Sequence, residues 1–178
     1  MMHLMRRLSR AVRREEGTST VEFVICIPMF MTVFMMSFES GMFMTKSVLL
    51  DRAVDLTIRE LRLGHIPNPT SAVLKDRICA KSIILPECEN SIMIELAPIN
   101  QVTMVMPTTS VQCVDRDEAI QPNLFVDVGN NNEIMLVRVC VLIEALFPST
   151  GLGERLIAGG PNGEIGMIAV SAFVNEPS

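Results

Sequence analysis

The sequence predicts an α+β fold in which a long N-terminal transmembrane helix continues into an exported domain with a small, mainly antiparallel sheet. The chain starts with an arginine-rich segment, which is followed by an apolar run with almost no charge. Apolar residues then recur with the spacing of a helix, and the alternation typical of strands comes only later in the chain. We therefore expect a basic cytoplasmic leader (1–17), a transmembrane helix (18–44) and a periplasmic or extracellular α+β domain (45–178).

Charge is distributed unevenly along the chain, whose formal net charge is −5. The leader carries five Arg and two Glu, a net +3, which leaves −8 for the remainder. Phosphate neutralisation and base stacking on aromatic faces supply much of the affinity of nucleic-acid-binding proteins. Because the domain is acidic and the chain has no Trp or Tyr, we expect no nucleic acid partner.

The apolar run Val21–Phe38 contains Glu22 as its only charged residue. As a helix it spans roughly 27 Å, close to the ~30 Å hydrocarbon core of a bilayer. Arginines before such a run favour the cytoplasmic side, so we expect a single pass with the N-terminus inside. A cleavable secretory signal is the alternative, although Phe38–Met44 offers only a weak small-residue cleavage site.

Glu22 requires an explanation, because a carboxylate inside a bilayer costs about 2.5 kcal/mol or more. One interpretation is a functional group that meets a partner within the membrane. The other is an interfacial residue in the first turn of the helix, where the helix dipole favours a negative charge.

The residues around Glu22 resemble the start of TadE-like pseudopilins of the tight-adherence (Flp) branch of type IV pilus systems. Besides a basic leader, the features that carry this resemblance are Gly17, Glu22 and Phe23 five and six residues later, Pro28 in the apolar run, and an acidic-x-Gly element at Glu39 and Gly41. The resemblance covers about a third of the chain. It leaves the TadE, TadF or TadG-like subtype open.

The resemblance implies a pilin-like fold and cleavage by a prepilin peptidase between Gly17 and Thr18. The mature protein would then join other pilins or pseudopilins and the pilus assembly platform in the bacterial inner membrane, in contact with lipid. The new α-amino group of Thr18 could neutralise Glu22 of a neighbouring subunit and set the register of packed helices. Phe23 belongs to the same element, and Pro28 is expected to kink the helix.

The expected function is therefore that of a minor pilin of Flp/Tad-type adherence pili, as initiator, shaft component or assembly factor, and not that of an enzyme. A membrane-anchored periplasmic binding or adaptor protein, not processed as a pilin, is the main alternative. A membrane-tethered thiol or hydrolytic enzyme is a weaker one, because the only histidines are His3 and His65 and no nucleophile has a recognisable base.

No cofactor or metal is expected. The acidic residues near Asp115 lack the spacing of an EF-hand, and the methionine-rich apolar run favours adaptable packing over copper binding. The Gly-Leu-Gly at 151–153 falls far short of a phosphate-binding loop.

Helical periodicity continues beyond the apolar run, until Gly64 and Pro67 end it. We expect one helix from about Thr18 to Leu63, roughly 69 Å long if continuous, with its outer half packed on a sheet. The residues expected to include its apolar stripe are Val48, Leu49, Arg52, Val54, Ile58 and Leu61.

The rest of the chain predicts a short helix over residues 70–80 and then strands. Ile134–Phe147 is the best strand and the expected centre of the sheet, because alternate residues form an entirely apolar face. Ile165–Val174 is a second strand, and a short helix around Glu154–Ala158 should interrupt the connection between them. Shorter β-prone runs are Ile92–Leu96, Val102–Met106, Val111–Val114 and Leu124–Val128.

Five cysteines divide between the two regions. Cys26 lies in the apolar run and is most simply a small apolar residue, with palmitoylation or intermolecular bridging as alternatives. The other four fall in the exported domain, where an oxidising compartment favours disulfides. Three pairings are possible, of which we prefer Cys79 with Cys88 and Cys113 with Cys140; a zinc site is the alternative.

Overall fold

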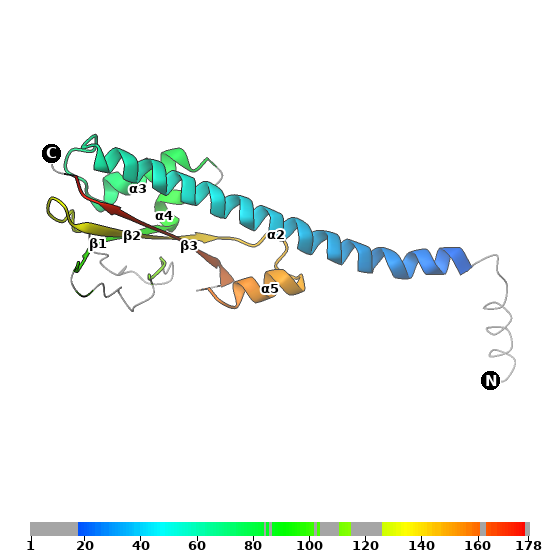
Figure 1. Cartoon of the computed structure of the whole chain (residues 1–178). Coiled ribbons are helices and arrows are strands. Elements are labelled where there is room, and N and C mark those ends of the chain that lie inside the picture. The colour runs from blue at the N-terminus through cyan, green and yellow to red at the C-terminus, as the bar shows by residue number, and fades with distance from the viewer. Residues whose placement is uncertain are drawn as a thin grey trace, which may run out of the picture.

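The computed structural model of the chain describes residues 18–83, 85, 87–101, 103, 111–114, 126–160 and 163–176. One long helix extends from a small α+β domain, as the sequence predicts (Figure 1). The elements, in chain order, are α2 (Thr18–Arg62), α3 (Ser71–Lys81), α4 (Cys88–Ser91), β1 (Ile92–Ile99), β2 (Ile134–Ile143), α5 (Gly151–Ile157) and β3 (Ile165–Val174).

The three strands form an antiparallel sheet in the order β1-β2-β3, with β2 at its centre as predicted. The bounds of β3 agree with the prediction, whereas β2 ends at Ile143, four residues before the predicted end at Phe147. The reason is that residues 144–147 leave the sheet and turn toward α2, where the backbone amides of Leu146 and Phe147 are bound by a side chain of the helix.

The weaker β-prone runs fare differently. Ile92–Leu96 lies within β1, but Val111–Val114 is not a strand, because its residues lie over the sheet instead of pairing with it. Of Leu124–Val128, only the last three residues are described, and Val126 forms an isolated parallel bridge to Leu96. The run Val102–Met106 lies outside the described residues except for Thr103.

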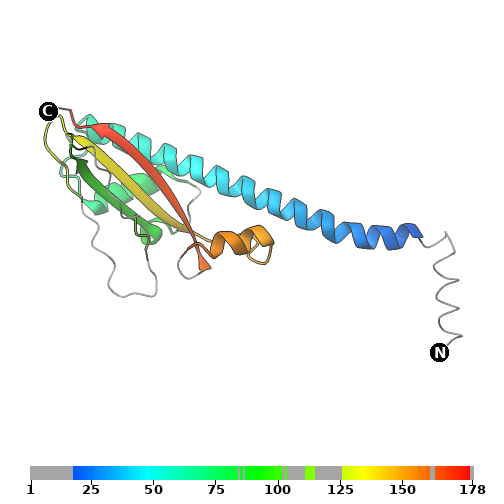
Figure 2. The ribbon, with the colours of Figure 1, turned by 60° about the horizontal axis from the view of Figure 1, so that its bottom comes forward.

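The outer half of α2 covers one face of the sheet (Figures 1 and 2). Its buried stripe repeats at three- and four-residue intervals, which places it on one side of the helix. The stripe consists of Leu50, Ala53, Val54, Thr57 and Ile58, with Leu61 partly buried. Two predicted members do not belong to the stripe: Val48 is 65% exposed, and Arg52 is exposed as well.

The alternating apolar residues of β2 face this stripe, as expected. Val139 is fully buried, and its neighbours Ile94 of β1 and Ala169 of β3 lie beside it in register. α3 completes this layer with Leu74 and Ile78. Burial of these side chains between helix and sheet forms the main core of the domain.

The opposite face of β2 is buried as well. Leu142 packs there against Met93 and Val114, and Arg138 forms a cross-strand ion pair with Glu95 at 2.6 Å. A buried ion pair of this kind is costly to break, because one charge would be left without its partner.

The helices α3 and α5 have side-chain caps that explain where they start. Thr70 accepts a hydrogen bond from the Val73 amide at the start of α3, and Thr150 accepts one from the Gly153 amide at the start of α5. Both helices lie close to their predicted positions.

Candidate assembly and membrane site

Residues 19–34, in the N-terminal half of α2, are all exposed, and Glu22 is the only charged residue among them. Among the described residues, one helix is long and apolar enough to cross a membrane, and none of its apolar segment is buried in the protein. The exposed large side chains include Phe23, Met29 and Phe30, each more than 60% exposed. Such a surface needs a partner outside the fold, and length and composition suit a bilayer.

Two hydroxyl groups in this half, those of Thr32 and Ser37, form hydrogen bonds within the helix. Thr32 donates to the carbonyl of Met29 and Ser37 donates to the carbonyl of Val33, both at 2.8 Å. Internal bonding of this kind allows polar side chains to enter hydrocarbon without unpaired donors.

The structure places the predicted assembly residues at the start of α2. Thr18 is its first residue, and Gly17 lies outside the described residues. Glu22 follows one turn after Thr18 and is exposed, without a hydrogen bond or ion pair to any described residue. Phe23 beside it is 63% exposed. Glu22 and Phe23 are therefore available to a partner outside the chain.

Pro28 lies within α2, which remains helical on both sides of it. Both views show the blue N-terminal end of α2 curved relative to the rest (Figures 1 and 2). A proline inside a helix removes one backbone hydrogen bond and favours a bend of this kind.

A second acidic residue of α2, Glu39, joins the exposed part of the helix to the domain. Glu39 is 4% exposed, and its two carboxylate oxygens accept hydrogen bonds from the amides of Leu146 and Phe147, at 3.1 and 2.9 Å. Next to it, the rings of Phe38 and Phe147 meet edge to face with their centroids 6.3 Å apart. We call this arrangement the Glu39 clasp. It fixes the chain that follows β2 to α2.

Sequence reasoning did not assign this role to Glu39, which entered only as part of the acidic-x-Gly element. The signal that could have found it is a second acid at the end of the apolar run, where an unpaired carboxylate would be costly. Gly41 has open space around it, so the structure supplies no packing reason for a glycine there.

The clasp continues into α5 through a series of local hydrogen bonds. The Thr150 hydroxyl and amide both donate to the Phe147 carbonyl, at 2.8 and 3.1 Å. A Cβ on Gly153 would collide with the same carbonyl, so only glycine permits this approach. The loop and α5 are therefore held at a defined height on α2.

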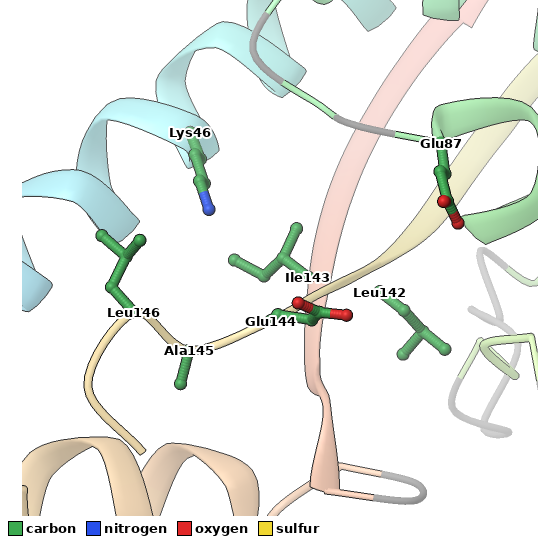
Figure 3. Close-up of a pocket in the computed structure, with 7 residues that line it drawn as sticks. All are labelled: Lys46, Glu87, Leu142, Ile143, Glu144, Ala145 and Leu146. Atoms are coloured by element: carbon green, nitrogen blue, oxygen red, sulfur yellow. The ribbon is translucent and has the colours of Figure 1, made fainter. Parts of the chain in front are cut away.

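A shallow cavity of about 290 Å³ lies beside the clasp, where Lys46 of α2 lies across from Glu144 and Leu146 (Figure 3). Glu87 lines its far side. Among the residues that the structure describes, no group of three or more His, Cys, Asp or Glu could hold a metal ion. The acidic residues Asp115, Asp117 and Glu118 lie outside that part of the chain.

Four cysteines of the domain form two disulfides, in the pairing preferred from the sequence. Cys79 is bonded to Cys88 with a Cα–Cα distance of 5.6 Å, and Cys113 to Cys140 with 5.2 Å. The first joins α3 to α4, and the second attaches the segment 111–114 to the central strand. Cys26 is free and exposed on the apolar half of α2.

In the described part of the domain, the surroundings of Glu60 and Lys75 shift the pKa values of these two groups. A hydrogen bond from Lys81 lowers the pKa of Glu60, whose carboxylate lies 2.8 Å from the Lys81 ammonium. Burial lowers the pKa of Lys75, because desolvation disfavours the charged form. Glu60 and Lys81 join the outer half of α2 to α3.

The family comparison agrees with the geometry of the N-terminal segment. The family model described as TadE-like protein matches residues 17–59, which include Glu22, Pro28 and Glu39. No curated protein and no solved structure matches the chain. A TadE-like segment implies involvement in Tad pilus systems, with other components of such a system as partners, and together with one apolar N-terminal helix it suggests a membrane-anchored protein. The resemblance to TadE-like proteins of the Tad pilus system is thus confirmed over residues 17–59.

Proposed function

We propose that the protein is a minor pilin of a Tad-type pilus, processed by a prepilin peptidase between Gly17 and Thr18 and assembled through its exposed apolar helix. The observation that carries the proposal is the segment 19–34 of α2, which is uncovered and contains Glu22 as its only charged residue. In this role the protein is a structural component and not an enzyme. It is anchored in the inner membrane with its domain in the periplasm.

Glu22 supplies the specific element of this assembly. After cleavage, Thr18 would carry a free α-amino group one helical turn before Glu22, on the same face of α2. Both groups lie on the outside of the helix, where another subunit can reach them. In a bundle, the α-amino group of one subunit can approach Glu22 of the next, which offsets the cost of a carboxylate in hydrocarbon. Unpaired subunits would then be disfavoured, and the pairing would set the axial register.

Processing is tested by measuring the intact mass of membrane-extracted protein from cells with and without an active prepilin peptidase. We expect a chain that starts at Thr18 only when the peptidase is active. A matched Gly17→Asp variant should keep its leader in both strains. A full-length wild-type chain in the presence of active peptidase would overturn the processing step and favour the anchored binding or adaptor protein.

Assembly is tested with Glu22→Gln, which removes the charge and keeps the size of the side chain. We expect normal membrane insertion and cleavage but a loss of co-purification with other pilus subunits. Glu144→Gln is the matched control, since Glu144 is an exposed acid of the domain. Undiminished co-purification of Glu22→Gln would contradict the role of Glu22 in register.

A further inference from the structure

The clasp and α5 lie at the height on α2 where the membrane should end. From Ser19, a helix needs about 20 residues at 1.5 Å each to cross a ~30 Å hydrocarbon core. Twenty residues from Ser19 end at Phe38, and the next residue is Glu39, which holds the loop after β2. The loop therefore meets α2 just where the helix leaves hydrocarbon.

The surface at this height is apolar and continues that of the membrane-spanning half. Phe38 is 49% exposed and Leu146 is 46% exposed, although both belong to segments that the clasp holds rigidly. In the close-up, Leu146 lies beside α2, with α5 on the far side of the loop (Figure 3). We call Phe38, Leu146 and Phe147 the apolar rim.

Aromatic side chains at such a rim match the lipid interface. Rings at the border between hydrocarbon and headgroups keep apolar surface out of water, as in the aromatic belts of membrane proteins. The domain face at this end carries the acids Glu144 and Glu154 and, beside them, the basic residues Lys46 and Arg155, so it has no excess of positive charge. Attraction to anionic lipid is therefore not its basis, and the contact should form with neutral lipid and persist at high salt.

We infer that the domain does not stand clear of the membrane: its apolar rim is seated in the outer lipid interface. The occupant of this surface is the bilayer in which α2 is anchored. The inference rests on the membrane anchor of the proposed function, but not on processing or on pilus assembly. In this arrangement the hydrocarbon core ends at Phe38 on the side of the loop, short of the predicted boundary at Met44.

The absence of Trp and Tyr from the chain makes a direct test possible. A single Trp placed at Leu146 is the only strong fluorophore of the full chain reconstituted in phosphatidylcholine bilayers. Bromine atoms on the lipid chains quench Trp at their own depth. We expect Leu146→Trp to be quenched more by bromine near the headgroups than by bromine near the bilayer centre, with emission at a shorter wavelength than for Trp in water.

Two variants calibrate the depth. Phe30→Trp, in the exposed half of α2, should be quenched most by bromine near the centre. Val174→Trp should not be quenched by brominated lipid. The Arg62–Glu176 ion pair holds the end of β3 beside the end of α2 that is farthest from the membrane. Phe38→Trp reports the same height as Leu146→Trp from the helix itself, so the test does not depend on how the loop accommodates an indole.

The outcomes separate the rim from the proposed function. If Leu146→Trp and Phe38→Trp behave like Val174→Trp while Phe30→Trp is quenched, the rim inference is overturned and the anchor stands. If Leu146→Trp is shielded from both lipid bromine and aqueous iodide, a neighbouring protein covers the rim and the inference also fails. If Phe30→Trp itself is not quenched, the anchor fails, and the rim with it. Loss of pilus assembly in cells would leave quenching at Leu146 unchanged.

Discussion

The two halves of α2 share one uninterrupted helix but differ in what covers them. In the outer half, a stripe through Leu50 and Val54 is buried against the sheet, and charged residues face water. In the inner half, apolar side chains such as Val24 and Phe30 are exposed on all sides. Local helix formation is common to both, so the surface pattern decides where each half lies. The first half is built for surroundings that the chain itself does not provide.

The largest effect should come from a cavity in the outer half. Leu50 is fully buried, so Leu50→Ala should lower the free energy of unfolding of the domain by about 4 kcal/mol. Phe30→Ala removes a larger side chain from the inner half and should leave that free energy within about 0.5 kcal/mol of wild type. Denaturant unfolding in mild detergent, followed by hydrogen exchange of the strands, measures both. Equal losses in the two variants would mean that the inner half is also part of the core.

The next largest effect on stability should come from a disulfide. Among the described residues, both disulfides lie in the domain, and Cys26 of the apolar half of α2 is free. Replacing both Cys113 and Cys140 with Ser opens a loop between residues 27 positions apart and should cost about 3 kcal/mol. Cys26→Ser should cost nothing measurable. Thermal unfolding of the oxidised proteins tests this, and a Cys26→Ser variant as unstable as the double variant would contradict it.

Two acids of α2 sharpen the comparison further. Glu39→Gln keeps one acceptor oxygen for two backbone amides, so it should destabilise the domain by about 2 kcal/mol and loosen the loop after β2. Glu22→Gln should leave domain stability unchanged. Protection of the Leu146 and Phe147 amides from hydrogen exchange reports the clasp directly. Unchanged protection in Glu39→Gln would show that the ring contact with Phe38 suffices to hold the loop.

The smallest effect should be pH-dependent. Because the Lys81 contact lowers the folded-state pKa of Glu60 below its ordinary value of 4.5, its contribution to stability is complete above that value and is lost as the pH falls through the folded pKa. Glu60→Gln should therefore be slightly less stable than wild type at neutral pH, and the difference should disappear in acid. Unfolding curves at several pH values test this. A difference that grows in acid would have the wrong sign.

Much of this fold could be predicted because its main elements have strong local patterns. The apolar run of α2, the alternation in β2 and the apolar segment of β3 can each be recognised within about ten to twenty residues of sequence. The stripe of the outer half was harder, since Val48 is as apolar as its buried neighbours and only the phase set by Leu50 and Ala53 shows which side faces the sheet.

The clasp could not be predicted from the sequence. Leu146 and Phe147 lie 107 and 108 residues after Glu39 in the sequence. The groups that Glu39 binds are backbone amides, which carry no side-chain signature. The segment Val111–Val114 was misjudged for a related reason. Its β-branched residues favour a strand, but the bond from Cys113 to Cys140 holds it across the sheet. In both places, a contact distant in sequence overrides local preference.

The unbroken course of α2 also has a mechanical consequence. The membrane anchor and the main wall of the core belong to one rod of 45 residues, without a linker between them. A rotation of the membrane-spanning end of α2, or an axial pull on it, is transmitted directly to the sheet. The contacts that the membrane-spanning part of α2 makes thus determine how the domain is rotated about the membrane normal.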